Sequence, residues 1–118
     1  ARFATPEQQA RLAELLEALR AADLGHTHTR ELMRHDLDVH RAIYAASGNA
    51  HLQNVLITYD NLATRIWCLV IGRMPHVEDH VGEHVALLEA VLDGRADDAE
   101  RIAREHVDGF EHAVRAVI

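Results

Sequence analysis

Apolar residues recur every three or four positions along most of the chain, a spacing that gives an α-helix one apolar face. The first such segment carries four leucines: Leu12, Leu15, Leu16 and Leu19. Just before it, Thr5 can cap a helix, Pro6 suits the first turn, and Gln8 stands where a capping box needs it. We therefore predict a helix from about residue 6 to 22.

Four more helices follow, and their ends are marked by residues that stop helices. Gly48 and Asn49 separate the second helix from the third, which Asn49 can cap. Pro75 follows the third helix, and Gly94 ends the fourth. Each connection is short, so neighbouring helices should pack antiparallel. No strand pattern or repeat is present. The sequence predicts one all-α domain over residues 1–118, an antiparallel helical bundle whose further helices span 29–46, 50–73, 76–93 and 96–118.

Polar residues interrupt the apolar stripes of three of these helices. The exceptions are Asp36, His40, His84 and His106. A carboxylate and three imidazoles that face the core are costly unless something satisfies them, and one divalent metal ion would satisfy all four together. Three imidazole nitrogens and one carboxylate oxygen suit Zn²⁺, Ni²⁺, Co²⁺, Fe²⁺ or Mn²⁺ better than Ca²⁺ or Mg²⁺.

Each of these residues also has an ordinary structural interpretation. A lone histidine on an apolar stripe is more often a hydrogen-bonded core residue than a ligand, and an Asp–His pair one turn apart is more often an ion pair. The metal interpretation is favoured because, without a metal, each of the four buried polar residues would need its own hydrogen-bond partner. His80 stands one turn before His84 and is an alternative ligand. The other histidines are expected on the surface or at helix ends.

Composition excludes several classes of function. The net charge is −7 and the pI about 5.7, so the chain lacks the basic surface that direct binding of DNA or RNA needs. Its one cysteine, Cys68, rules out an internal disulfide and a thiolate zinc site, and fits a reducing cytosol. We see no apolar run near the roughly 20 residues of a membrane span and expect no membrane partner.

Several segments resemble one known family. Residues 36–49, DLDVHRAIYAASGN, resemble the D-x-x-F-H-R-A-(I/L)-x-x-A-S-G-N signature of the FCD domain, with Val39 replacing the commoner Phe. Residues 83–91, EHVALLEAV, are similar to its E-H-x-x-(I/L)-L-x-A-(I/L) segment, and 97–106 to its D-x-x-x-A…H stretch. Residues 4–7, ATPE, look like the start of an early helix. The FCD domain is the C-terminal effector-binding domain of FadR-type GntR transcription regulators.

The resemblance implies a function and a set of ligands. In that family the matching residues bind a divalent metal, and carried over they are Asp36, His40, His84 and His106. Zn²⁺ is the ion we expect first. The effector would be a small organic acid, the protein a cytoplasmic homodimer, and DNA would be bound only through an N-terminal winged helix-turn-helix domain. We expect that domain, and the start of the first FCD helix, to be absent from this chain.

A second cation should hold the far end of an acidic effector. Arg65 is the first candidate, on a mixed face of the helix at 50–73, and Arg73 at the helix end is the weaker one. A solvent-facing or ion-paired role competes for both. Tyr59 is a third candidate for effector binding, although a core role is also possible for it.

The helix at 50–73 has more apolar residues than a small bundle needs. They include Leu52, Val55, Leu56, Leu62, Leu69 and Val70. A dimer interface is one use for them, but we expect core packing to account for most.

Two other functions remain open beside the sensor domain of a regulator, which is not an enzyme. The first is a small helical metalloenzyme that uses the same Asp/His₃ site. It needs a general base, and Glu83 points about 100 degrees away from its neighbour His84 on a helix. The second is a metal-free interaction module with structural histidines. Stability that does not respond to a chelator would favour that alternative.

Overall fold

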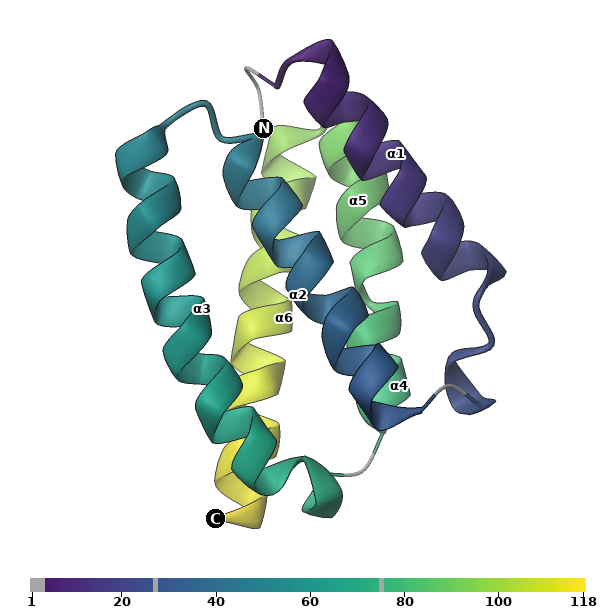
Figure 1. The fold of residues 1–118 in the computed structure, drawn as a ribbon, viewed down its shortest axis with the longest axis vertical. Coiled ribbons are helices and arrows are strands. Elements are labelled where there is room, and N and C mark those ends of the chain that lie inside the picture. The colour runs from purple at the N-terminus through teal and green to yellow at the C-terminus, as the bar shows by residue number, and fades with distance from the viewer. Residues whose placement is uncertain (1–3, 27, 75) are drawn as a thin grey trace.

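The chain folds as an array of helices, as the sequence predicts. The computed structural model describes residues 4–26, 28–74 and 76–118, so Pro75, the expected helix breaker, lies outside the described residues. The described part is 86% helical and contains no strand. Successive long helices alternate in direction across the molecule (Figure 1). The prediction of an all-α fold is confirmed.

Six α-helices and two 3₁₀ turns make up the described fold. In chain order they are α1 (Pro6–Ala21), η1 (Leu24–His26), α2 (Thr29–Ala45), α3 (Ala50–Val70), η2 (Ile71–Arg73), α4 (Val77–Gly82), α5 (His84–Leu92) and α6 (Ala96–Val117). The predicted helix over 50–73 is thus an α-helix that tightens into a 3₁₀ turn at its end, a common way for a helix to terminate.

The predicted caps are present at the starts of α1 and α3. The Thr5 hydroxyl accepts a hydrogen bond from the Gln8 backbone N–H, and the Gln8 side chain accepts one from the Thr5 backbone N–H, which completes the capping box. Asn49 Oδ1 accepts from the Leu52 N–H at 3.0 Å. Gly48 before α3 has a φ of 73°, which a glycine adopts without strain. These local signals fix where both helices begin.

The prediction of a single helix over residues 76–93 is wrong in one respect. The structure divides it into α4 and α5, with the break at Glu83. Gly82 precedes the break, and a Cβ there would lie 3.4 Å from Leu24 of η1. Glycine is a poor helix former, so the segment is easily interrupted where it lets η1 approach closely. Glu83 itself keeps right-handed helical angles, and α5 continues upward from α4 (Figure 1).

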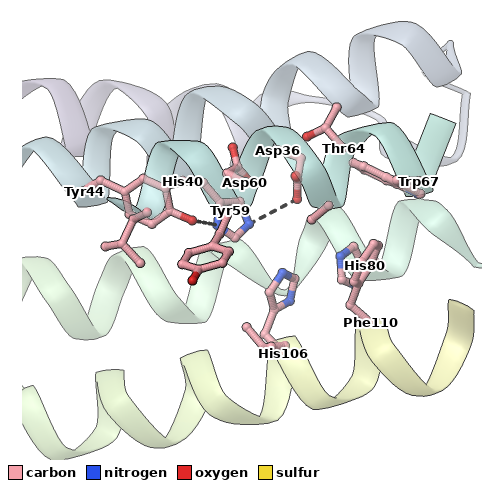
Figure 2. Close-up of a pocket in the computed structure, with 13 residues that line it drawn as sticks. Asp36, His40, Tyr44, Tyr59, Asp60, Thr64, Trp67, His80, His106 and Phe110 are labelled. Atoms are coloured by element: carbon pink, nitrogen blue, oxygen red, sulfur yellow. Dashed lines mark hydrogen bonds and ion pairs between the residues drawn. The ribbon is translucent and has the colours of Figure 1, made fainter. Parts of the chain in front are cut away.

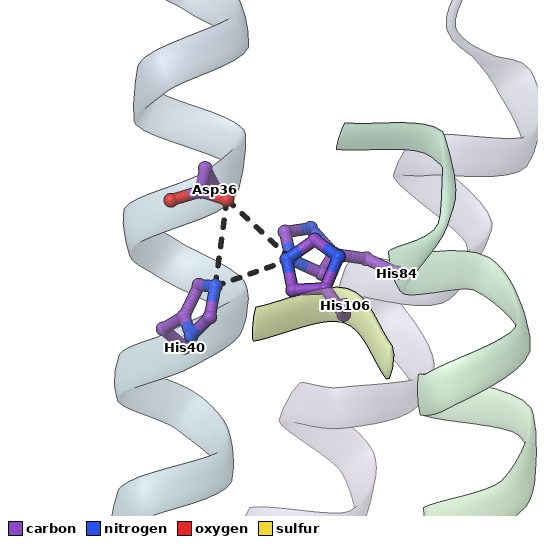
Figure 3. A group of neighbouring side chains, drawn as sticks. All are labelled: Asp36, His40, His84 and His106. Atoms are coloured by element: carbon purple, nitrogen blue, oxygen red, sulfur yellow. Dashed lines mark hydrogen bonds and ion pairs between the residues drawn. The ribbon is translucent and has the colours of Figure 1, made fainter. Parts of the chain in front are cut away.

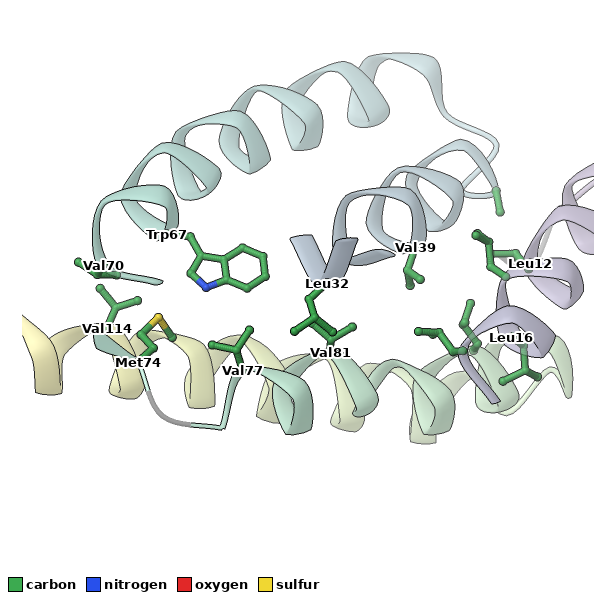
Figure 4. Packing of buried hydrophobic residues seen from close by; sticks show 14 residues of the cluster. Leu12, Leu16, Leu32, Val39, Trp67, Val70, Met74, Val77, Val81 and Val114 are labelled. Carbon is green, nitrogen blue, oxygen red and sulfur yellow. The ribbon is translucent and has the colours of Figure 1, made fainter. Parts of the chain in front are cut away.

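The core holds the helices that carry the polar cluster in place. α1 packs against α2 and α5, α5 packs against α6, and α2 packs against α3. Val39, Val81 and Leu88 are fully buried between these helices. At the other end of the core, Trp67 of α3 packs among smaller side chains near α4 and α6 (Figure 4). Packing at both ends of the core therefore fixes the orientation of the helix faces that carry the polar residues.

The outer face of α3 departs from the expectation that core packing uses its apolar residues. Six large side chains there are exposed: Leu52 44%, Val55 38%, Tyr59 66%, Leu62 48%, Ile66 48% and Leu69 80%. Of the residues named from the sequence, Val70 is buried and Leu56 partly so. The exposed positions alternate by three and four residues, so they form one stripe along the helix. We call these six residues the α3 stripe.

The same helix corrects the expectation that no segment is long and apolar enough to cross a membrane. Ala50–Arg73 meets that criterion by length and composition, with a mean hydropathy of 1.2. One such helix is weak support for a membrane span. Asp60 lies near its middle, on a face turned toward a pocket of the bundle. The exposed apolar residues therefore lie on one side of the helix, as in a helix that packs against another helix.

Candidate metal and effector site

The four polar residues selected by the stripes meet between three helices. Asp36 and His40 lie one turn apart on α2. His84 begins α5, and His106 comes from the middle of α6 (Figure 3). Asp36 is 6% exposed, His84 0% and His106 4%, while the side chain of His40 is 19% exposed. The prediction that all four point inward agrees with this geometry, and one side of the cluster, at His40, remains open.

The separations between the donor atoms match those around a single metal ion. His84 Nε2 lies 3.2 Å from His40 Nε2 and 3.1 Å from His106 Nε2. Asp36 Oδ1 lies 3.4 Å from both His40 Nε2 and His84 Nε2. With bonds of about 2.1 Å, adjacent ligand atoms are about 3.0 Å apart in an octahedral site and about 3.4 Å apart in a tetrahedral one. These four separations are those of ligand atoms around one transition metal ion, and the remaining pairs lie within 4.8 Å.

The cluster also has unsatisfied polar atoms. Asp36 Oδ1 and His84 Nδ1 are buried, and neither has a hydrogen-bond partner among the described residues. The Glu83 carboxylate lies 2.7 Å from His106 Nδ1, which places a proton on that nitrogen and leaves the Nε2 lone pair facing the cluster. Lone pairs that face one another in a dry site repel. A cation between them would remove the repulsion and satisfy Asp36 at once.

Burial and mutual charge set the protonation of the cluster. Burial lowers the pKa of His84 to about 3, so this imidazole is neutral near pH 7. Burial alone would raise the pKa of Asp36, but the close approach and the charge of His40 outweigh this effect, and the pKa lies below its ordinary value. Burial opposes protonation of His40 too, yet Asp36 raises its pKa overall. A carboxylate and neutral imidazoles are the forms that bind metal, and a proton on His40 competes.

Two further side chains hold the histidine rings. Glu83, whose side chain is 53% exposed, contacts His106 Nδ1, and the Tyr44 hydroxyl lies 3.4 Å from His40 Nδ1. Partners of this kind fix the orientation and tautomer of metal-binding histidines. Sequence reasoning considered Glu83 only for its direction relative to His84. Its contact with His106 depends on how α4 and α5 pack on α6, which helical periodicity does not show.

His80, the alternative ligand, occupies a neighbouring position. Its ring stacks on His106, with ring centroids 4.2 Å apart. Burial first and then the charge of His106 lower its pKa to about 4. His80, Glu83 and His106 form a second, more exposed group of potential ligand atoms. His84 rather than His80 completes the buried four-residue group, in line with its better place on the apolar stripe.

A pocket of about 190 Å³ opens beside the cluster, between α2, α3 and α6 (Figure 2). Its polar lining consists of Asp36, His40, Tyr44, Tyr59, Asp60, Thr64, Trp67, His80 and His106. A larger cavity of about 620 Å³ also reaches His40 and His106. The cluster is therefore approached by these cavities at Asp36, His40 and His106, whereas His84 lines neither of them.

Of the three residues expected to bind an effector, one lines this pocket and two do not. Tyr59 is among the lining residues, at a rim position with 66% exposure. Arg65 and Arg73 are both exposed, and neither lines the two cavities that reach the cluster. Their role in effector binding stays a prediction that the geometry does not support.

Asp60 of α3 is the polar pocket residue that sequence reasoning missed. Its Oδ2 atom is buried without a hydrogen-bond partner among the described residues, and burial raises the pKa of the carboxyl. A signal was available, because Asp60 is seven residues before Trp67 and so shares its face of the helix. The polar residues of the helix instead favour the mixed face that carries Arg65, and that residue is exposed.

The fold and the cluster define an all-helical domain with an inward Asp/His₃ group that opens on a pocket. Comparison with protein families matches residues 1–109 to the FCD domain. The chain therefore belongs to the FCD family, whose domains form the C-terminal part of GntR-family transcription regulators. Such domains belong to regulators rather than to enzymes. No curated protein and no solved structure matches the chain.

Proposed function

We propose that this domain is the sensor of a FadR-type GntR regulator and binds one divalent transition metal ion together with a small carboxylic acid. The observation that carries the proposal is the buried four-residue group Asp36, His40, His84 and His106, whose ligand atoms all lie within 4.8 Å of one another. Zn²⁺ is the first candidate because it favours such nitrogen and oxygen sets, and Ni²⁺, Mn²⁺, Fe²⁺ and Co²⁺ accept the same donors.

Different residues would bind the metal, orient its ligands and admit the effector. The bound ion would supply a positive charge to which a carboxylate can bind. Glu83 keeps His106 in the metal-binding tautomer by accepting the Nδ1 proton. His40 must likewise donate from Nδ1, toward the Tyr44 hydroxyl oxygen. The pocket beside His40 gives the effector access, and Tyr59 lies at its rim.

The position of the site suggests how effector binding changes the binding of DNA by a complete regulator. Its ligands come from α2, α5 and α6, so a bound ion would link three helices in addition to their core packing and the Glu83–His106 contact. An effector that binds one arrangement of these helices better than another shifts the population toward it. In a complete regulator, this shift would change how the winged helix-turn-helix domains sit on their operator.

The α3 stripe supports a homodimer as part of this proposal. Its residues are spaced 3-4-3-4-3 along the helix, which is the pattern of a helix that packs on a partner helix. A stripe exposed to water along nearly the whole of α3 is larger than the scattered apolar residues of ordinary surfaces. Packing of two copies through it would bury this surface in a cytoplasmic regulator, without insertion into a membrane.

The proposal is tested by thermal unfolding of the wild type with metal, with chelator, and with metal plus organic acids. We expect metal to raise the melting temperature, chelator to reverse this, and at least one acid to add a shift only when metal is present. His106→Ala should abolish both shifts. His112→Ala, which removes an exposed histidine of the same helix, is the matched control and should keep them. Stability indifferent to metal and chelator would favour the metal-free module.

A further inference from the structure

The pocket beside the cluster has an unusual charge for a site that receives an acid. The chain contains no lysine, and none of its arginines is among the described residues that line the pocket. Two carboxyl groups, Asp36 and Asp60, line it instead. Asp36 is used by the metal site. Asp60 comes from α3, and its carboxylate remains to bind a ligand in the pocket.

Asp60 has no partner that would make its role purely structural. Its Oδ2 atom is buried and accepts no hydrogen bond, and no ion pair within 4.0 Å is found for it among the described residues. His40 and, more weakly, Arg41 of α2 are the basic groups whose charges act on it, but the Arg41 guanidinium hydrogen-bonds to Asn61 Oδ1 at 3.1 Å. A buried acceptor without a donor costs about 1–3 kcal/mol, which a ligand with a suitable donor would recover.

Asp60 lines the same pocket as Asp36 and His40, but from α3 rather than from α2. Its charge interacts with those of His40 and Asp36, and Figure 2 shows it above the cluster with Thr64 one turn along the same helix. The pocket volume of about 190 Å³ is close to that of cavities that hold a benzene-sized molecule. A compact ligand can therefore contact the metal and Asp60 together.

We propose that the effector is a small amino-substituted carboxylic acid, with its carboxylate on the metal side of the pocket and its ammonium group on Asp60. This rests on the proposed function and names its ligand class. Charge balance favours it, because a divalent ion, Asp36 and Asp60 are together neutral, and a zwitterion keeps the buried site neutral whereas a dicarboxylate adds two negative charges. A distal ammonium also supplies the donors that Asp60 lacks.

The test is calorimetric titration of the zinc-loaded protein with two matched series of acids. One consists of β-alanine, propionate and malonate, and the other of γ-aminobutyrate, butyrate and succinate. In at least one series the amino acid should bind about tenfold or more tightly than both relatives, a difference of about 1.4 kcal/mol. Asp60→Asn should remove that preference and leave propionate or butyrate unchanged. Asp108→Asn, an exposed aspartate on α6, should keep it.

Zinc content measured on the same samples separates this inference from the function on which it rests. Asp60→Asn should retain the zinc of the wild type, since Asp60 is not a ligand. If zinc binds but the dicarboxylates bind as well as the amino acids, or no amino acid binds at millimolar concentration, the ligand class is wrong and the metal site stands. If Asp60→Asn weakens the binding of all the acids equally, Asp60 does not contact the ammonium group of the ligand. A wild type that takes up no zinc overturns both proposals.

Discussion

Glu83→Gln tests whether the metal site depends on the residues around its ligands. The Glu83 carboxylate lies 2.7 Å from Nδ1 of His106, the distance of a strong charge-assisted hydrogen bond. Glutamine keeps an oxygen that can accept the Nδ1 proton but removes the charge. His106 would still be oriented, but it would be a weaker donor to the metal.

The size of the effect follows from the exposure of Glu83. Loss of such a partner typically lowers metal affinity by about 10- to 100-fold. Because the Glu83 side chain is 53% exposed, water screens its charge, and we expect the lower limit. The predicted weakening is about tenfold, equivalent to about 1.4 kcal/mol of binding free energy.

The assay is a competition titration for Zn²⁺ against a chromophoric chelator at pH 7. Glu105→Gln is the matched control, because Glu105 is next to His106 in sequence but is exposed and pairs with Arg101 instead. Its affinity should equal that of the wild type. Unchanged affinity in Glu83→Gln would refute the reasoning. A loss well beyond hundredfold would show that Glu83 is itself a ligand, as in the alternative group with His80.

The remaining predictions concern stability. Because burial lowers the pKa of His84 from 6.5 to about 3, its stabilising contribution is complete above pH 6.5 and falls as the pH drops below it. Burial lowers the pKa of His80 to about 4, so this residue acts in the same direction. Between pH 7 and 5 the metal-free protein should lose up to about 4 kcal/mol in urea unfolding, about 2 from each of these histidines, less an opposite contribution from His40, whose pKa is raised; equal or greater stability at pH 5 would contradict this. Leu88→Ala, at a fully buried position, should cost about 2–5 kcal/mol in the same assay, and a loss below 1 kcal/mol would mean that this core is loosely packed.

Local signals made much of the fold predictable. Thr5 and Asn49 cap the helices that the sequence assigns to them, because capping depends only on residues three or four positions apart. The break at Glu83 was missed because the apolar period continues through it. Gly82 was the available sign, but its effect depends on the approach of Leu24 from another part of the chain.

The candidate ligands were found from helical period alone, and the groups around them were not. Asp36, His40, His84 and His106 each interrupt an apolar stripe, which requires no knowledge of the neighbouring helices. Asp60 lies on a helix with apolar residues on two faces, and its spacing of seven residues from Trp67 is the sign that it faces the bundle. The outward α3 stripe shows a further difficulty: apolar residues predict burial, but not whether the partner is the same chain.

The metal content of the purified protein is the measurement that tests the central claim most directly. Elemental mass spectrometry of the wild type should find about one equivalent of a transition metal per chain. Asp36→Ala and His106→Ala should each lose it, whereas His112→Ala should retain it. Metal absent from the wild type after reconstitution, or retained in full by both ligand variants, would contradict the four-residue site.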